Sequence, residues 1–218
     1  MSEPTPPPTT TVLQVVDDLR DRIRHGLLVP GQRLVEIDLT RELGISRGPL
    51  REALSRLAME GLVVIEPYRG AMVRKLSPAD LQDLYQVREV LEATAARLAA
   101  SRVGEGDFAE RLRAALAENA RYRQDPDVPA YLAFNERFHL LVAEMSGNAL
   151  LGRLLNQLRT QTFRLQFRRM TPEARQDAVA QHEAVGAAIL AGDADAAETA
   201  MRRHVRRGGE VVRAIATA

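Results

Sequence analysis

Two side chains that can bind a metal stand four positions apart in the segment FNERFH. Asn135 and His139 therefore lie one above the other on a single helix face. Leu132 and Val142 continue that face, so a polar pair interrupts a stripe that should face a core. An amide oxygen and an imidazole nitrogen are both ligands of divalent metals. The spacing indicates a candidate metal site on the inner face of a helix.

Two of the other three histidines also interrupt apolar helical stripes. His182 shares a face with Val185 and Ile189, and His204 shares one with Met201. Buried imidazoles need partners, and one shared ion would satisfy all three rings at once. Zinc is the first expectation for such a ligand set, with nickel, manganese or iron as alternatives. The competing interpretation is that each histidine is a core residue with its own local partner.

An arginine stands within another apolar row. Arg88 follows Leu84 and precedes Leu91 at helical spacing. It either pairs with Glu92 one turn later, extends to solvent, or anchors a ligand carboxylate. The third interpretation predicts that Arg88 binds a small carboxylate effector beside the metal.

The composition excludes several classes of protein. The chain has 218 residues and no cysteine, so it has no disulfide framework, thiol catalysis or cysteine-ligated zinc finger. No run approaches about 18 apolar residues, and the N-terminus lacks the basic and apolar regions of a secretory signal. We therefore expect a cytoplasmic protein without a membrane partner.

The elements that must position these residues are mainly α-helical. Residues 1–10 read as a flexible arm, and residues 11–76 as helix, short helix, tight turn, helix and β-hairpin, with 62–66 paired to 71–75. A domain boundary is expected at Ser77-Pro78, and residues 77–218 are expected to form an all-α bundle. Its six predicted helices cover 78–102, 107–123, 128–146, 149–169, 172–191 and 194–215.

The order of elements in residues 11–76 is that of a winged helix-turn-helix. Gly44 allows the tight turn, and the next helix begins at Arg47 and Gly48, with Arg51 one turn on. A recognition helix contacts base edges through its first residues, and an outward arginine can pair with guanine. Arg69 and Gly70 at the hairpin tip can enter the minor groove. The alternative is that the arginines form a solvated face with neighbouring glutamates.

The segment RLVEIDLTRELGISRGPLREALSRLAMEGLVVIEPYRGAMV resembles the DNA-binding domain of the GntR family of bacterial transcription regulators. The resemblance implies contacts to DNA from the start of the recognition helix, here Ser46, Arg47 and Arg51, and from the wing tip, here Arg69 and Gly70. This chain has Gly48 where the family usually has threonine, and Ile37 where some members have arginine.

Residues 78–216 are similar to the FCD ligand-binding domain of the FadR subfamily, and six helices resemble its VanR-like branch. That resemblance implies that Asn135, His139, His182 and His204 bind a metal; the last two are 22 positions apart, as in the family. Relatives often have aspartate at position 135, so this site has one negative charge fewer.

Together these features predict a homodimeric transcription regulator, most often a repressor in this family, that binds a pseudo-palindromic DNA operator. A small carboxylate in the helical domain would modulate that binding. The sequence leaves two alternative functions open. One is a metal-dependent hydrolase or isomerase fused to a winged helix. The other is a DNA-binding dimer with purely structural histidines.

Overall fold

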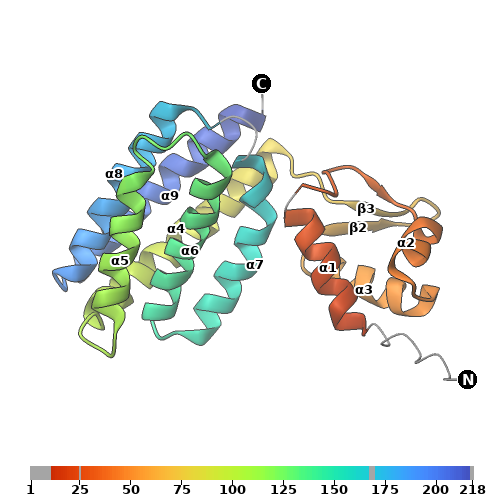
Figure 1. Cartoon of the computed structure of the whole chain (residues 1–218), viewed down its shortest axis with the longest axis horizontal. Coiled ribbons are helices and arrows are strands. Elements are labelled where there is room, and N and C mark those ends of the chain that lie inside the picture. The colour runs from red at the N-terminus through yellow and green to blue at the C-terminus, as the bar shows by residue number, and fades with distance from the viewer. Residues whose placement is uncertain (1–10, 25, 167–169, 217–218) are drawn as a thin grey trace, which may run out of the picture. The chain divides into compact units, whose positions relative to one another are not determined.

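The computed structural model describes residues 11–24, 26–166 and 170–216, with the side chains of 159–166 and 213–216 excepted. The predicted arm at residues 1–10 lies outside the described residues. The chain divides into two compact units, Met1–Lys75 and Leu76–Ala218 (Figure 1). Each unit has its own hydrophobic core.

The first unit is a three-helix domain with a small antiparallel sheet. Its elements are α1 (Val12–Arg24), β1 (Arg33–Leu34), α2 (Glu36–Leu43), α3 (Arg47–Met59), β2 (Val63–Glu66) and β3 (Gly70–Val73). The strand order is β1-β3-β2, and Glu66 pairs with Gly70 at the hairpin end. This is a winged helix-turn-helix, as predicted.

Local sequence explains the order of these elements. Leu19 and Ile23 of α1 are buried with Leu50 and Leu54 of α3, so the apolar stripes of the two helices share one core. Gly44 ends α2 at φ 65°, in the left-handed region that glycine adopts without strain. The two-stranded prediction for the sheet was incomplete. Strand β1 also pairs with β3, and its two residues are too few to give an alternating pattern.

The second unit is all-helical among the described residues (Figure 1). Its six helices are α4 (Pro78–Ser101), α5 (Phe108–Arg121), α6 (Val128–Met145), α7 (Ala149–Gln166), α8 (Pro172–Leu190) and α9 (Ala194–Ala216). The prediction of a mainly α fold is confirmed, and each predicted helix appears. Five of the six begin at the predicted residue, and the other compared ends differ by one or two residues. The end predicted at residue 169 lies outside the described residues. None of the described helices is long and apolar enough to cross a membrane.

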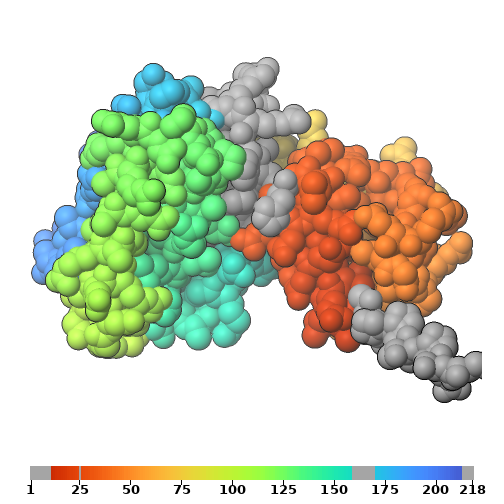
Figure 2. All heavy atoms as spheres, viewed as in Figure 1, coloured from red at the N-terminus to blue at the C-terminus, as the bar shows by residue number. Residues whose placement is uncertain are grey.

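Side-chain caps and small residues set the packing of this bundle. Ser77 caps α4 in a reciprocal capping box with Asp80, while Asp127 and Thr171 cap α6 and α8. Helix α4 packs mainly along α9, and α9 also packs along α8. A Cβ on Gly209 of α9 would lie 2.9 Å from Cγ of Tyr85, so glycine is needed for this close approach. Figure 2 shows α5 on the visible face of this unit.

Candidate nucleic-acid interface and metal centre

The start of α3 is an exposed polar surface. Ser46 occupies the N-cap position with extended backbone, but its hydroxyl makes no capping hydrogen bond. Ser46, Arg47 and Gly48 are all exposed, whereas Leu50 and Leu54 are buried on the opposite side. The N-terminal turn of α3 therefore presents a hydroxyl, a guanidinium group and open backbone, which are the groups that contact phosphates and base edges.

Arg51 is exposed one turn further along α3. Its Nε lies 3.0 Å from Oε1 of Glu36 at the start of α2. This hydrogen bond raises the pKa of Arg51 above its usual value. Exposed ion pairs contribute little free energy, so a phosphate or guanine could replace Glu36 at small cost. Sequence reasoning predicted the outward arginine but not this partner.

The tip of the wing presents exposed residues in the turn between β2 and β3 and at the first residue of β3. Arg69 is exposed and Gly70 has φ 83°, as a tight turn requires. Tyr68 is fully exposed and has φ 63°, a conformation that is unusual for a bulky residue. Neither its exposure nor its strained backbone could be inferred from the pattern of the hairpin.

Three histidines from three helices meet inside the second unit. His139 of α6, His182 of α8 and His204 of α9 are buried, and a nitrogen of each lies within 4.8 Å of the others. Nε2 of His139 is 3.1 Å from Nε2 of His204. The structure thus brings together the three histidines that sequence reasoning selected.

Each of these imidazoles has an oxygen acceptor at its other nitrogen. Nδ1 of His182 is 3.1 Å from Oδ1 of Asn119, and Nδ1 of His204 is 3.0 Å from Oε1 of Gln181. Nδ1 of His139 contacts Oε2 of Glu92, without the alignment of a hydrogen bond. Amide and carboxylate oxygens can only accept, so each Nδ1 is expected to carry the hydrogen.

Asn119 is oriented by a second hydrogen bond. Its Nδ2 donates to the carbonyl oxygen of Val179 at 2.9 Å, which directs Oδ1 toward His182. Asn119 is fully buried on α5. No spacing in the sequence connects Asn119, Gln181 or Glu92 to the histidines, so sequence reasoning missed all three. Of the three, only Glu92 could be singled out from the sequence, because it stands one helical turn after Arg88.

This arrangement fits a divalent metal. With hydrogen on each Nδ1, the Nε2 atoms of His139 and His204 direct lone pairs toward each other across 3.1 Å. Two lone pairs repel unless a cation binds both. Nitrogen ligands about 2.0–2.1 Å from zinc lie roughly 2.9–3.4 Å from each other. The acceptors at Nδ1 resemble the outer ligands that orient histidines in metal sites.

Arg88 and Glu92 form a buried ion pair on α4. Nη2 of Arg88 lies 2.7 Å from Oε1 of Glu92, and the side chains are only 5% and 2% exposed. Burial disfavours the charge on Arg88, but Glu92 and Tyr85 outweigh it and raise the pKa of Arg88. The pairing that the sequence left open is therefore present. Arg88 links to His139 through Glu92, and its direct contact with an effector remains a prediction.

Asn135 stands one turn before His139 on α6 and is half-buried. Its position on the helix agrees with the predicted face, whereas its role as a fourth metal ligand remains a prediction.

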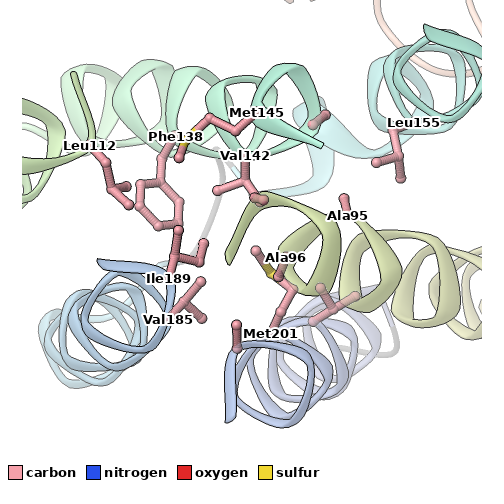
Figure 3. Close-up of a cluster of buried hydrophobic side chains, with 14 of the residues drawn as sticks. Ala95, Ala96, Leu112, Phe138, Val142, Met145, Leu155, Val185, Ile189 and Met201 are labelled. Carbon is pink, nitrogen blue, oxygen red and sulfur yellow. The ribbon is translucent and has the colours of Figure 1, made fainter. Parts of the chain in front are cut away.

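An apolar layer closes one end of the histidine cluster. Val142 follows His139 by one turn, Val185 follows His182, and Met201 precedes His204. All three side chains belong to one cluster of buried hydrophobic residues (Figure 3). These side chains are almost completely buried. Tightly packed apolar side chains therefore fill this end of the cluster.

A pocket lies beyond the other end. It opens between α8 and α9, and its lining includes Ala174 and Ala178, which precede His182, and Gly208, which follows His204. Gln181 and His204 also line it, so the pocket reaches one of the metal-ligand candidates directly. The arrangement therefore offers a small molecule a route to the cluster from one side.

Comparisons with known proteins agree with both units. Residues 11–73 match the family of bacterial regulatory proteins named gntR, and residues 83–207 match the FCD domain. The chain is 31% identical to a probable D-xylose utilization operon transcriptional repressor of Paenarthrobacter nicotinovorans, over 90% of this chain and 86% of that protein. It is 29% identical to the HTH-type transcriptional repressor RspR of Escherichia coli, over 97% and 92%.

The fold is similar to that of a solved structure described as E. coli McbR/YncC. The TM-score is 0.77 at 24% identity, and the match covers 92% of this chain and 96% of that one. The family and these relatives are transcription regulators, so the prediction that the chain is not an enzyme is confirmed. The chain belongs to the GntR family of DNA-binding transcription regulators and carries an FCD domain, consistent with a FadR-like member.

Proposed function

We propose that this regulator is a metal-dependent repressor whose DNA affinity is controlled by a small organic acid. The metal is held by Nε2 of His139, His182 and His204, with Asn135 as a further ligand. Zinc is the first choice, and nickel, manganese and iron are alternatives. When bound, the ion offers a Lewis-acidic position to an effector carboxylate.

One observation carries the metal proposal: the 3.1 Å separation between Nε2 of His139 and Nε2 of His204, with an oxygen acceptor at each Nδ1. Histidines with purely structural roles would gain most from hydrogen bonds at both nitrogens. Here Nδ1 of His182 and Nδ1 of His204 each bond an amide oxygen, and Nδ1 of His139 contacts the carboxylate of Glu92. The second nitrogens of the three rings are then left to bind a shared ion. This geometry favours the metal over the structural alternative.

We further propose that the DNA contacts come from Ser46, Arg47, Gly48 and Arg51 of the recognition helix, and from Arg69 and Gly70 of the wing. Their exposure supports this assignment. Arginine can bind guanine or phosphate through two hydrogen bonds. Open backbone at Gly48 and Gly70 allows close approach to the sugar-phosphate chain.

A homodimer in the bacterial cytoplasm would read a pseudo-palindromic operator, because two-fold symmetric proteins read half-sites about one helical turn apart. Exposed apolar residues on two neighbouring helices support a second copy as the partner: Val87 and Val90 on α4, and Leu150 and Leu154 on α7. Exposed apolar groups of this kind mark association surfaces.

The effector acts only if it binds one arrangement of the dimer better than another. The experiment starts with an operator selected from random DNA by the zinc-loaded full-length protein. Metabolic acids are then tested for release of that operator, first on the wild type and then on His204→Ala. We expect an acid that weakens operator affinity at least tenfold in the wild type only.

Two results would contradict this proposal. An operator affinity that no carboxylate changes would exclude the effector function. If His204→Ala or the metal-free wild type responded as strongly as the zinc-loaded wild type, the metal would have no part in the response.

A further inference from the structure

Two buried hydrogen-bond donors lie on the pocket side of the histidine cluster. Arg175 precedes His182 by two turns on α8, and Tyr131 precedes His139 by two turns on α6. Their residues are only 5% and 1% exposed. The rings of Tyr131 and His182 are stacked with centroids 6.5 Å apart, so Tyr131 adjoins the proposed metal centre.

Neither donor has its acceptor among the residues that the structure describes. The hydroxyl of Tyr131 and Nε of Arg175 form no hydrogen bond there, and no described carboxylate pairs with Arg175. The stretch RTQTFRLQFRR at 159–169 contains no aspartate or glutamate, so it cannot supply the missing charge. Arginine does not deprotonate in proteins, and an uncompensated buried charge is strongly destabilising.

The two groups also cannot satisfy each other. Burial raises the pKa of Tyr131, and the positive charge of Arg175 only partly opposes this. Tyr131 is therefore a neutral phenol at physiological pH, and its hydroxyl is available as a donor. A water molecule could accept hydrogen bonds from both groups, but it would not balance the charge of Arg175. An anion would accept both hydrogen bonds and balance that charge.

A pocket opens toward the same end of the histidine cluster, although neither Arg175 nor Tyr131 lines it. Ala174 and Ala178, on either side of Arg175 in the sequence, line the pocket between α8 and α9 that ends at His204. The apolar layer of Val142, Val185 and Met201 lies at the opposite end of the cluster. The pocket and the two buried donors thus lie toward the same end of the proposed metal centre, away from the apolar layer.

We propose that Arg175 and Tyr131 form an anion subsite that binds a carboxylate of the effector away from the metal. The inference rests on the proposed function and narrows its ligand class. The effector would be an organic acid with two oxygen-bearing ends: a carboxylate at Arg175 and a second carboxylate or hydroxyl group toward the metal. Dicarboxylic and hydroxy acids have this chemistry.

Acetate is the probe for the subsite, because it carries the carboxylate alone. Thermal unfolding of metal-free, full-length protein is followed in a buffer of large zwitterions as sodium acetate is added. We expect the wild-type midpoint to rise by about 3 °C at an acetate concentration near ten times Kd. Arg175→Met should show no rise, Tyr131→Phe a smaller one, and Arg175→Lys a partial one.

Arg97→Met is the matched control, because Arg97 is an exposed arginine of the same bundle that already pairs with Asp195 and Glu198. It should respond to acetate like the wild type. Without acetate, Arg175→Met should unfold at or above the wild-type temperature, since it removes an uncompensated charge. A wild type that does not respond, or a response in Arg175→Met equal to the wild type's, would overturn the subsite.

The same experiment on zinc-loaded protein separates this inference from the proposed function. If acetate stabilises only the zinc-loaded form, and equally in Arg175→Met, the carboxylate binds the metal and the subsite is wrong. If the acetate response depends on Arg175 but no acid alters operator binding, the subsite stands and the proposed function is wrong.

Discussion

Nε2 of His139 and Nε2 of His204 lie 3.1 Å apart, while Nδ1 of each ring faces a side-chain oxygen. The two findings belong together, because an acceptor at Nδ1 fixes the tautomer that leaves a lone pair on Nε2. Helices α6 and α9 therefore bring two basic nitrogens to a separation that a shared metal ion accommodates.

Glu92 should control metal affinity without being a ligand. Glu92→Gln removes the charge that orients His139 and leaves Arg88 without its buried counterion. We expect the Kd for zinc to rise by about 10–100-fold, the usual effect of losing an outer partner of a ligating histidine. Competition with a zinc-binding dye measures it. Glu89 lies on the same helix as Glu92 and pairs with Arg206 of α9, so Glu89→Gln is the control and should leave the Kd unchanged. Equal effects of the two substitutions would contradict this role for Glu92.

The side chain at position 135 should influence the affinity of the site for zinc. Asn135→Asp replaces a neutral amide by a carboxylate, a stronger ligand for a divalent cation. We expect tighter zinc binding by about tenfold or more, measured by the same dye competition. Asn156→Asp, on α7, is the matched control and should not tighten binding. An unchanged Kd in Asn135→Asp would exclude residue 135 from the coordination sphere.

Alanine substitutions at two adjacent glycines of α9 should change the free energy of unfolding in opposite directions. A Cβ on Gly209 would lie 2.9 Å from Cγ of Tyr85, whereas one on Gly208 would lie 3.7 Å from Cε1 of the same ring. Overpacking a core lowers stability by about 1–3 kcal/mol. In a helix interior, alanine is more stabilising than glycine by up to about 1 kcal/mol.

Gly209→Ala is therefore expected to lower the free energy of unfolding by about 1–2 kcal/mol. Gly208→Ala is expected to raise it by about 0.5–1 kcal/mol. Urea denaturation compares them. If both alanines stabilise the protein, α4 and α9 are not packed as closely as the structure indicates.

Arg51 should contribute to specific DNA recognition. Arg51→Ala is expected to weaken binding to the selected operator by about 1–3 kcal/mol, and to leave the zinc content unchanged. Arg56→Ala, in the last turn of the same helix, is the control and should have little effect. Fluorescence anisotropy at fixed salt measures both. An unchanged operator affinity in Arg51→Ala would remove this residue from the interface.

The sequence predicted most of the fold because the helices carry strong local signals. Ser77 with Asp80 and Gly44 mark helix ends through bonds within a few residues, so these ends need no tertiary information. Strand β1 was missed for the opposite reason. Its two residues become a strand only because residues of β3, 37 and 39 positions away, pair with them.

The histidines of the candidate metal site were also predictable, because polar residues on apolar stripes stand out. Their partners were not. Asn119 reaches His182 across 63 positions, and Arg175 appears in the sequence as one more arginine on a polar-rich segment. Only its burial in the structure distinguishes it from the many exposed arginines of the chain.

The most direct test of the central claim is the zinc stoichiometry of the full-length protein after removal of metal and titration with zinc. We expect one zinc per chain, bound with a Kd below about 1 μM in the wild type. His139→Ala and His204→Ala should lose this site while keeping their helical circular dichroism. A wild type that binds no zinc, or variants that bind it as tightly as the wild type, would contradict a metal centre built by these histidines.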